Sequence, residues 1–168
     1  MRVAVTGTPG TGKTTATDLV DTDLEVVHLN EVIEDRGLYS ETDPERGSYV
    51  ADVDAIQEEY AAESNLLVES HLAHLLDVDR VIVLRCHPRT IRERLLDRGE
   101  ATESAAENAQ SEALDVILAE AVERHGEAAV YEIETTDRSP ETTAQEIEAA
   151  VAGEREPSAG TVDYTDFL

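Results

Sequence analysis

The stretch from Gly7 to Thr14 reads GTPGTGKT and fits the pattern G-x-x-x-x-G-K-[ST]. An apolar run from Arg2 to Thr6 precedes it, and its β-branched residues predict a buried strand. The segment TTATDLVDTD follows, with the spacing of a helix. A strand before and a helix after are the context in which this pattern forms a phosphate-binding loop, or P-loop. The sequence therefore predicts an α/β domain that binds a nucleoside triphosphate.

Each residue type in this loop predicts a particular contact. Gly10 and Gly12 let backbone N–H groups turn inward around phosphate oxygens, and the helix N-terminus adds partial positive charge. Lys13 is expected to reach the β- and γ-phosphates of ATP, and the Thr14 hydroxyl to ligate Mg²⁺. Thr15 is expected to meet the α-phosphate. Lys13 is also the only lysine among 13 basic residues, so a chain that otherwise uses arginine retains lysine where a compact charge is needed.

The chain is strongly acidic, with 38 Asp plus Glu against 13 Lys plus Arg and a net charge of -25. Regular apolar periods argue against disorder, so we interpret the charge as an adaptation to a salt-rich cytoplasm, where molar salt shortens the Debye length to about 3 Å. We expect a cytoplasmic protein that does not bind nucleic acid directly. No apolar run reaches the roughly 18 residues that span a bilayer. The single cysteine, Cys86, excludes an internal disulfide and is expected to be a buried thiol.

Alternating strand and helix patterns predict one domain over residues 1–168, with a three-layer fold and a mostly parallel sheet of five strands. Two polar stretches, about 30–51 and 98–108, are longer than simple connections and are expected to be an acceptor-binding insertion and a lid. The apolar tail residues Tyr164, Phe167 and Leu168 are expected to dock on the body. The other strands are expected at 24–29, 65–70, 80–86 and 129–136, and helices at 30–38 (capped by Asn30), 53–64, 89–98, 108–125 and 140–154, with 39–52 and 100–107 irregular.

A P-loop alone does not choose among kinases, GTPases and motor ATPases. GTPase specificity would need an N/T-K-x-D element, and this chain lacks the second lysine. Motor ATPases are normally larger. A small P-loop protein with two polar insertions resembles a nucleoside monophosphate kinase, although a small-metabolite kinase of the shikimate or gluconate type would share the sheet and the loop.

Four segments make the resemblance more specific: GTPGTGKTT, NLLVESH, RVIVLRCHPRTIRERLLDRG and the EN within AAENAQSEAL. Together with the GTVDY tail, they resemble the archaeal and eukaryotic adenylate-kinase-like family, the group of the sixth adenylate kinase isoform. This resemblance implies an adenylate kinase fold, with ATP, Mg²⁺ and AMP or another monophosphate as ligands. It also implies side ATPase activity and maturation of the small ribosomal subunit and its 16S rRNA, with a ribosomal protein and pre-30S particles as partners. In the alternative reading, ATP hydrolysis drives an assembly factor and kinase activity is secondary.

The resemblance extends to further residues. Glu69-Ser70-His71 matches an acidic-x-His element that usually begins with Asp, so Glu69 is expected to hold Mg²⁺ or its water or to orient a nucleophile, and His71 to polarise water. His71 could instead be a hydrogen-bonded packing residue, and with His74 it lacks a third ligand for a metal site. Arg98 occupies the RG position of the lid and is expected to meet the triphosphate. The family usually continues with Tyr and lysine, whereas residues 100–104 here read EATES.

Two further arginines are candidates for binding substrate. Arg85 ends a predicted strand, where ligands bind in open α/β sheets, and is expected to clamp a phosphate. Arg36 and Arg46 are the only cations of the first insertion, and we expect Arg36 to meet the acceptor phosphate. The loop at residues 137–140 lies where the family makes its adenine contacts, largely through backbone.

Overall fold

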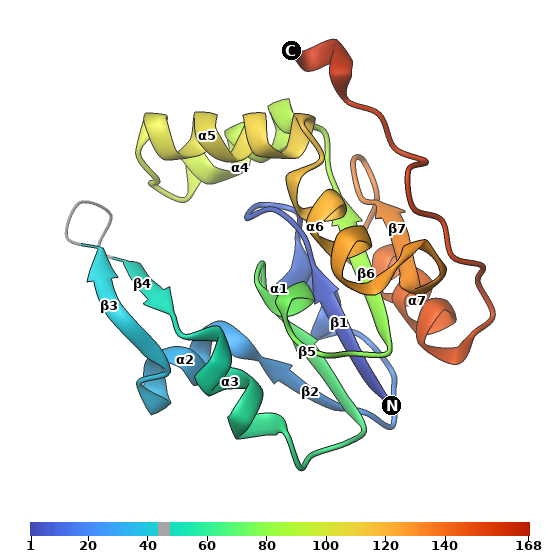
Figure 1. Ribbon diagram of the computed structural model, residues 1–168. Helices are drawn as coiled ribbons and strands as arrows, with labels where there is room; N and C mark the ends of the chain where they lie inside the picture. The colour runs from blue at the N-terminus through green and yellow to red at the C-terminus, as the bar shows by residue number, and fades with distance from the viewer. Residues whose placement is uncertain (44–47) are drawn as a thin grey trace.

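A computed structural model describes residues 1–43 and 48–168. A parallel sheet of five strands runs through the body in the order β2-β5-β1-β6-β7 (Figure 1). The central strand, β1, pairs in parallel with one strand on each side: Val5 of β1 lies opposite Glu69 of β5 and Ile82 of β6. The predicted α/β fold is confirmed. The strands are β1 (Arg2–Thr6), β2 (Glu25–His28), β5 (Leu66–Glu69), β6 (Arg80–Arg85) and β7 (Val130–Glu134).

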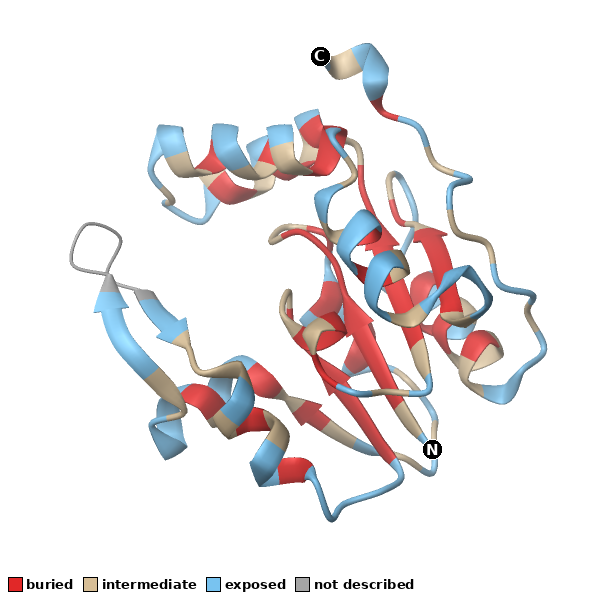
Figure 2. Ribbon diagram, in the orientation of Figure 1, coloured by how far each residue is buried: buried red, intermediate tan, exposed pale blue. Residues whose placement is uncertain are grey.

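Helices cover both faces of the sheet because side chains alternate along each strand. Val3 and Val5 face one layer, where they pack with Ala16 of α1 and Ile147 of α7. Ala4 faces the opposite layer, formed by α2, α3 and α6. Figure 2 shows buried residues concentrated along the strands between these layers. The helices are α1 (Lys13–Thr17), α2 (Leu29–Arg36), α3 (Val53–Tyr60), α4 (Pro88–Asp97), α5 (Thr102–Ala113), α6 (Val116–His125) and α7 (Pro140–Ala152), with short 3-10 turns η1 (Ala73–Leu75), η2 (Glu127–Ala129) and η3 (Thr165–Phe167).

The first polar stretch is more ordered than we expected. Instead of irregular chain it contains an antiparallel hairpin, β3 (Tyr39–Asp43) and β4 (Ser48–Ala51). The rings of Tyr39 and Tyr49 stack across the hairpin with centroids 4.1 Å apart, a cross-strand contact that the intervening polar residues conceal in the sequence. Arg46 lies outside the described residues.

The secondary structure predicted for the second polar stretch and the helix after it is wrong. Residues 102–113 form α5, and the expected single helix at 108–125 is two helices that meet at Asp115, which has a φ of 57°. The helix α5 is hard to recognise in the sequence because its apolar stripe is narrow. Ala105, Ala109 and Ala113 recur every four residues and are buried, while most of α5 is polar. In addition, α2 begins at Leu29 after His28, so Asn30 is not its N-cap.

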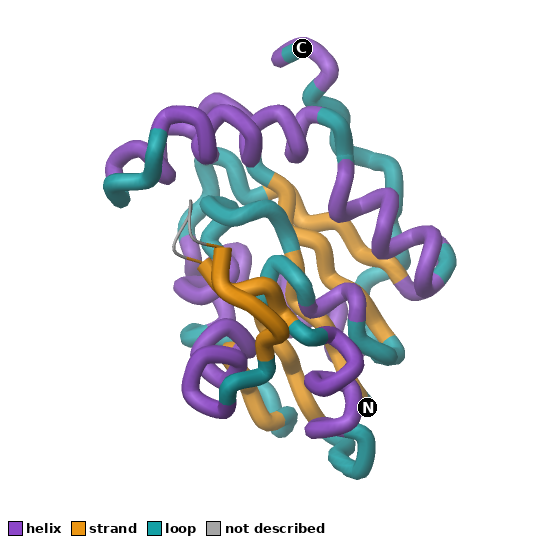
Figure 3. Tube along the Cα trace, turned by 60° about the vertical axis from the view of Figure 1, so that its left-hand side comes forward, coloured by secondary structure: helices purple, strands orange, loops and turns teal. Residues whose placement is uncertain are grey.

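The hairpin and the α4–α5 pair both project beyond the carboxyl ends of the central strands (Figures 1 and 3). The tail folds back on the body through Tyr164, which is buried and donates its hydroxyl to Glu134, so the predicted docking is confirmed for this residue. Leu168 remains exposed. No helix within the described residues is long and apolar enough to cross a membrane.

Candidate active site

The loop between β1 and α1 depends on glycine at two positions. Gly7 has a φ of 149°, and a Cβ there would lie 2.6 Å from the carbonyl oxygen of Leu84, which is backbone and cannot yield. Gly12 has a φ of 87° and caps α1 in the left-handed conformation. The chain therefore turns sharply from strand to helix and presents the helix N-terminus to the loop.

Lys13 is folded back onto its own loop. Its Nζ donates to the carbonyl oxygen of Thr8 at 3.2 Å. Burial lowers the pKa of this ammonium to about 8, and the carboxylates of Glu69 and Glu112 oppose the fall. A single loop carbonyl is a contact that the ammonium can exchange for phosphate oxygens.

Thr14 and Glu69 form a pair of oxygen donors beside the loop. The Thr14 hydroxyl donates to Oε1 of Glu69 at 2.6 Å, and the Glu69 side chain is buried at the end of β5. The described residues contain no group of three or more His, Cys, Asp or Glu that could hold a metal alone. Mg²⁺ commonly takes only one or two protein oxygens and completes its shell with phosphates and water, so this pair fits an ion that arrives with a nucleotide.

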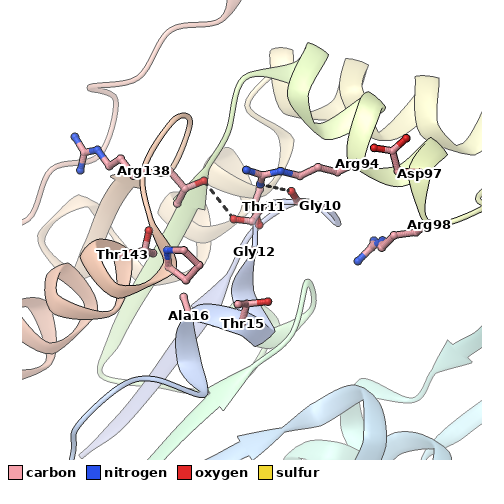
Figure 4. Close-up of a pocket in the computed structure, with 12 residues that line it drawn as sticks. Gly10, Thr11, Gly12, Thr15, Ala16, Arg94, Asp97, Arg98, Arg138 and Thr143 are labelled. Atoms are coloured by element: carbon pink, nitrogen blue, oxygen red, sulfur yellow. Dashed lines mark hydrogen bonds between the residues drawn. The ribbon is translucent and has the colours of Figure 1, made fainter.

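A cavity of about 380 Å³ opens on one side of the loop. In Figure 4 Gly12 and Thr15 lie below Gly10, and the side chains of Arg94, from α4, and Arg98, the residue after α4, reach toward the loop. Arg94 donates from Nη1 to the carbonyl oxygen of Gly10 at 3.0 Å, which ties α4 to the loop. The wall opposite α4 is made of Thr135, Arg138, Pro140 and Thr143.

A second cavity, of about 310 Å³, lies over Lys13 itself. It brings together eight of the predicted site residues: Gly10, Gly12, Lys13, Thr14, Thr15, Glu69, His71 and Arg98. Arg98 lines both cavities, its side chain is 59% exposed, and its only ion-pair contact among the described residues is Glu100 at 3.8 Å. This arginine is free to move onto a bound anion.

Comparisons with known proteins show the family to which this chain belongs. A family model described as "AAA domain" matches residues 3–115. The protein "Putative adenylate kinase" of Halobacterium salinarum is 61% identical over 169 residues, and the protein of that name from Natronomonas pharaonis is 60% identical over 168; each alignment covers 100% of both chains. The chain belongs to the "Putative adenylate kinase" family.

Two solved structures share the fold of this family member at low identity. A shikimate kinase from Bacteroides thetaiotaomicron has a TM-score of 0.53 and 17% identity, covering 90% of this chain and 98% of its own. A sulfotransferase from Alicyclobacillus acidocaldarius has a TM-score of 0.59 and 10% identity, covering 98% of this chain and 86% of its own. At such identities the likeness supports the fold and does not select an acceptor.

The two histidines of this family member have different surroundings. Burial lowers the pKa of His71 to about 4, and the charge of Lys13 adds to the effect. His71 is therefore neutral near pH 7 and lines the cavity over Lys13. His74 is buried, with Nδ1 2.9 Å from the Thr6 hydroxyl and Nε2 2.7 Å from Oε2 of Glu120, so it is a packing residue that joins β1 to α6.

The prediction that Arg85 faces the ligand crevice is wrong. Its guanidinium is buried and donates to Glu112, Asp115 and Glu132 at 2.6 to 3.2 Å. Arg85 lines neither cavity beside the loop, because three carboxylates hold it on the far side of β6.

Arg36 is also not gathered into the site. It pairs with Glu59 and lines a separate cavity with Glu25 and Tyr60, beside the edge strand β2. Arg36 is the last residue of α2 and lies on the surface.

Two contacts of this family member were missed in the sequence. Glu112 accepts a hydrogen bond from the Thr8 hydroxyl at 3.2 Å and so anchors the loop to α5. The sequence feature that could have indicated this role is that Glu112 lies three residues after Ala109, as a lone carboxylate on the apolar stripe of α5. His28 faces Glu69 from β2, and nothing in its sequence surroundings distinguishes it.

Proposed function

We propose that this protein catalyses reversible transfer of the γ-phosphoryl group of ATP to a nucleoside monophosphate, with AMP as the favoured acceptor. The observation that carries the proposal is the grouping of Lys13, the Thr14–Glu69 pair and Arg98 around one cavity that adjoins a nucleotide-sized one. The names of the relatives support the choice of reaction. Phosphoryl transfer requires mainly positioning and charge neutralisation, which these groups can supply.

In this mechanism Lys13 leaves the Thr8 carbonyl and binds the β- and γ-phosphate oxygens. Thr14 and Glu69 would hold Mg²⁺, which when bound neutralises part of the phosphate charge. Arg98 turns from Glu100 onto the transferring group. The nucleotide base and ribose would occupy the cavity between α4 and the 135–143 segment, where Arg94 keeps Gly10 in place.

We further propose that residues 98–108 act as the lid and residues 30–51 as the acceptor insertion. Both segments include chain that projects beyond the sheet on the side of the P-loop. Their closure would exclude water, which otherwise accepts the phosphoryl group and gives ATP hydrolysis. Because residues 100–104 are acidic rather than basic, closure over the phosphates relies on Arg98, and we expect measurable hydrolysis without an acceptor.

The test is ADP formation from ATP in molar KCl, measured with and without AMP. We expect AMP to stimulate ADP formation severalfold over basal hydrolysis, and Lys13→Ala to abolish both. Basal hydrolysis that AMP does not change would contradict the kinase assignment, while hydrolysis that is undetectable without AMP would contradict the side ATPase activity.

One observation favours the assembly-factor alternative. A cavity of about 820 Å³ adjoins Thr8 and His71 on the α5–α6 side, and its described lining includes Glu100 and Glu120 but no arginine or lysine. Such a surface suits a basic protein segment better than a phosphate. If a small-subunit ribosomal protein stimulates hydrolysis and AMP does not, hydrolysis on an assembling ribosomal particle is the main function.

A further inference from the structure

His28 and Glu69 are neighbours in the sheet. The parallel pairing of β2 with β5 places His28 directly beside Glu69. In-register neighbours of a parallel pair point to the same face, so the imidazole and the carboxylate meet at the carboxyl ends of their strands. Nδ1 of His28 lies 3.6 Å from Oε2 of Glu69.

The imidazole is held from its other side by the P-loop helix. Nε2 of His28 lies 2.9 Å from Oδ1 of Asp18, the residue that ends α1. With the ring fixed in this way, Nδ1 is buried and has no hydrogen-bond partner among residues 1–43 and 48–168. Leaving a buried polar nitrogen without a partner destabilises the fold, so we look for its partner in another state of the site.

Glu69 needs a second contact in the state that binds metal. Here its Oε1 accepts from Thr14 at 2.6 Å. If Mg²⁺ coordinates a lone pair of the Thr14 oxygen, the hydroxyl hydrogen can still donate to Oε1, but this single contact does not fix the orientation of the carboxylate. A glutamate has one more rotatable bond than an aspartate, so an unrestrained Glu69 would lose more freedom when it is ordered.

We propose that His28 is a positioning residue that donates from Nδ1 to Oε2 of Glu69 and thereby aims Oε1 at Mg²⁺ or its water. Because Asp18 and Glu69 both accept, the ring carries an N–H on each nitrogen in this arrangement. His28 acts through Glu69 and touches neither nucleotide nor metal. Asp18 completes the arrangement, because it fixes the ring to the helix that carries Lys13 and Thr14. The inference rests on the metal-binding role given to Glu69 in the proposed function.

Two substitutions separate the two ring nitrogens. In His28→Asn the amide nitrogen can take the place of Nδ1 and still donate to Glu69. In His28→Gln the amide reaches the place of Nε2, so the contact with Asp18 is kept and the one with Glu69 is lost. The pair is matched in polarity, and both proteins are first compared by thermal unfolding in molar KCl.

The primary measurement is Mn²⁺ binding to the protein–ADP complex, followed by the electron paramagnetic resonance signal of free Mn²⁺. We expect His28→Gln to weaken Mn²⁺ binding at least about tenfold, as expected for loss of a hydrogen bond to a charged group, and His28→Asn to stay within about twofold of the native protein. The Mg²⁺ concentration for half-maximal turnover should shift in the same order. Equal Mn²⁺ affinities in the two variants would overturn the proposal.

Glu69→Gln distinguishes failure of the inference from failure of its premise. It should weaken Mn²⁺ binding at least as much as His28→Gln, and the double variant should lose no more than Glu69→Gln alone. If Glu69→Gln has no effect, the metal role of Glu69 is wrong and the inference falls with it. If only Glu69→Gln has an effect, the premise stands and the role of His28 is wrong. Because these titrations contain no acceptor, they do not depend on whether AMP is the substrate.

Discussion

The guanidinium of Arg85 donates from Nη1 to Oε2 of Glu132 at 2.8 Å, and both side chains are fully buried. Its Nε and Nη2 donate to Glu112 and Asp115, and the ring of Tyr164 lies 5.4 Å from its Cζ. Burial raises the pKa of Glu112, while the charge of Arg85 opposes this rise. One arginine thus compensates a cluster of carboxylates that joins β6, β7, α5 and the tail.

We predict that Arg85→Leu destabilises the fold by about 3–5 kcal/mol, because it leaves buried carboxylates without their cation. The measurement is urea unfolding in molar KCl, with Arg89→Leu on the exposed side of α4 as the matched control, for which we expect a change within about 0.5 kcal/mol. The KM for ATP of folded Arg85→Leu should stay within about twofold of the native value. A stable variant with a strongly raised KM would restore Arg85 as a phosphate clamp.

The difference between Lys13 and Arg85 shows what the sequence can predict. The loop contacts are local: Lys13, Thr8 and the glycines lie within one short motif whose flanking strand and helix are legible in the sequence. The partners of Arg85 lie 27 and 47 residues away, so its burial depends on how α5 and β7 pack. A strand-end arginine therefore resembles a ligand-binding residue until its long-range partners are known.

The secondary structure of the two polar stretches was mispredicted for a related reason. The hairpin is held by one tyrosine stack within polar chain, and α5 buries only a stripe of alanines. Neither gives the strong apolar period by which the five sheet strands were recognised. The outward position of Arg36 follows from where α2 ends, and helix boundaries are set by tertiary packing as much as by sequence.

Lys13→Arg should lower kcat/KM for ATP by about two orders of magnitude although it keeps the charge. The native ammonium occupies a buried position within the loop, where a larger planar guanidinium cannot take the same place. Steady-state kinetics would measure the loss of kcat/KM, with Lys13→Ala as the inactive reference and circular dichroism to verify folding. Retention of more than half of the native kcat/KM would show that only charge matters at this position.

Low salt should destabilise the protein. At a net charge of -25, repulsion between carboxylates grows as the Debye length rises from about 2 Å in 3 M KCl to about 10 Å in 0.1 M. We expect the midpoint of thermal unfolding to fall steadily over this range. Sucrose at matched water activity, added to the protein in 0.1 M KCl, is the control. Because sucrose does not screen charge, it should raise the unfolding midpoint less than KCl does. A midpoint independent of KCl would contradict the adaptation to salt.

Cys86 should be inert in the native protein. It is fully buried among Ile91, Leu95 and Ala105, and burial raises the pKa of its thiol, so the reactive thiolate is scarce. Ellman's reagent should label it at least a hundredfold more slowly in the native state than in guanidinium chloride, where one thiol per chain should react. Rapid labelling of the native protein would mean that α4 opens readily from β6.

His71 should make stability depend on pH between about 4 and 6.5. Burial lowers the pKa of the folded imidazole to about 4, while that of the unfolded chain stays near 6.5. Within this window the unfolded state binds the extra proton, so stability falls as pH falls. His71→Gln lacks this contribution and should gain about 1–2 kcal/mol relative to the native protein between pH 7 and pH 5. Urea unfolding of both proteins at each pH measures the difference, and the titration of carboxylates largely cancels between them. A difference that does not change with pH would show that His71 titrates normally and is accessible to water in the folded protein.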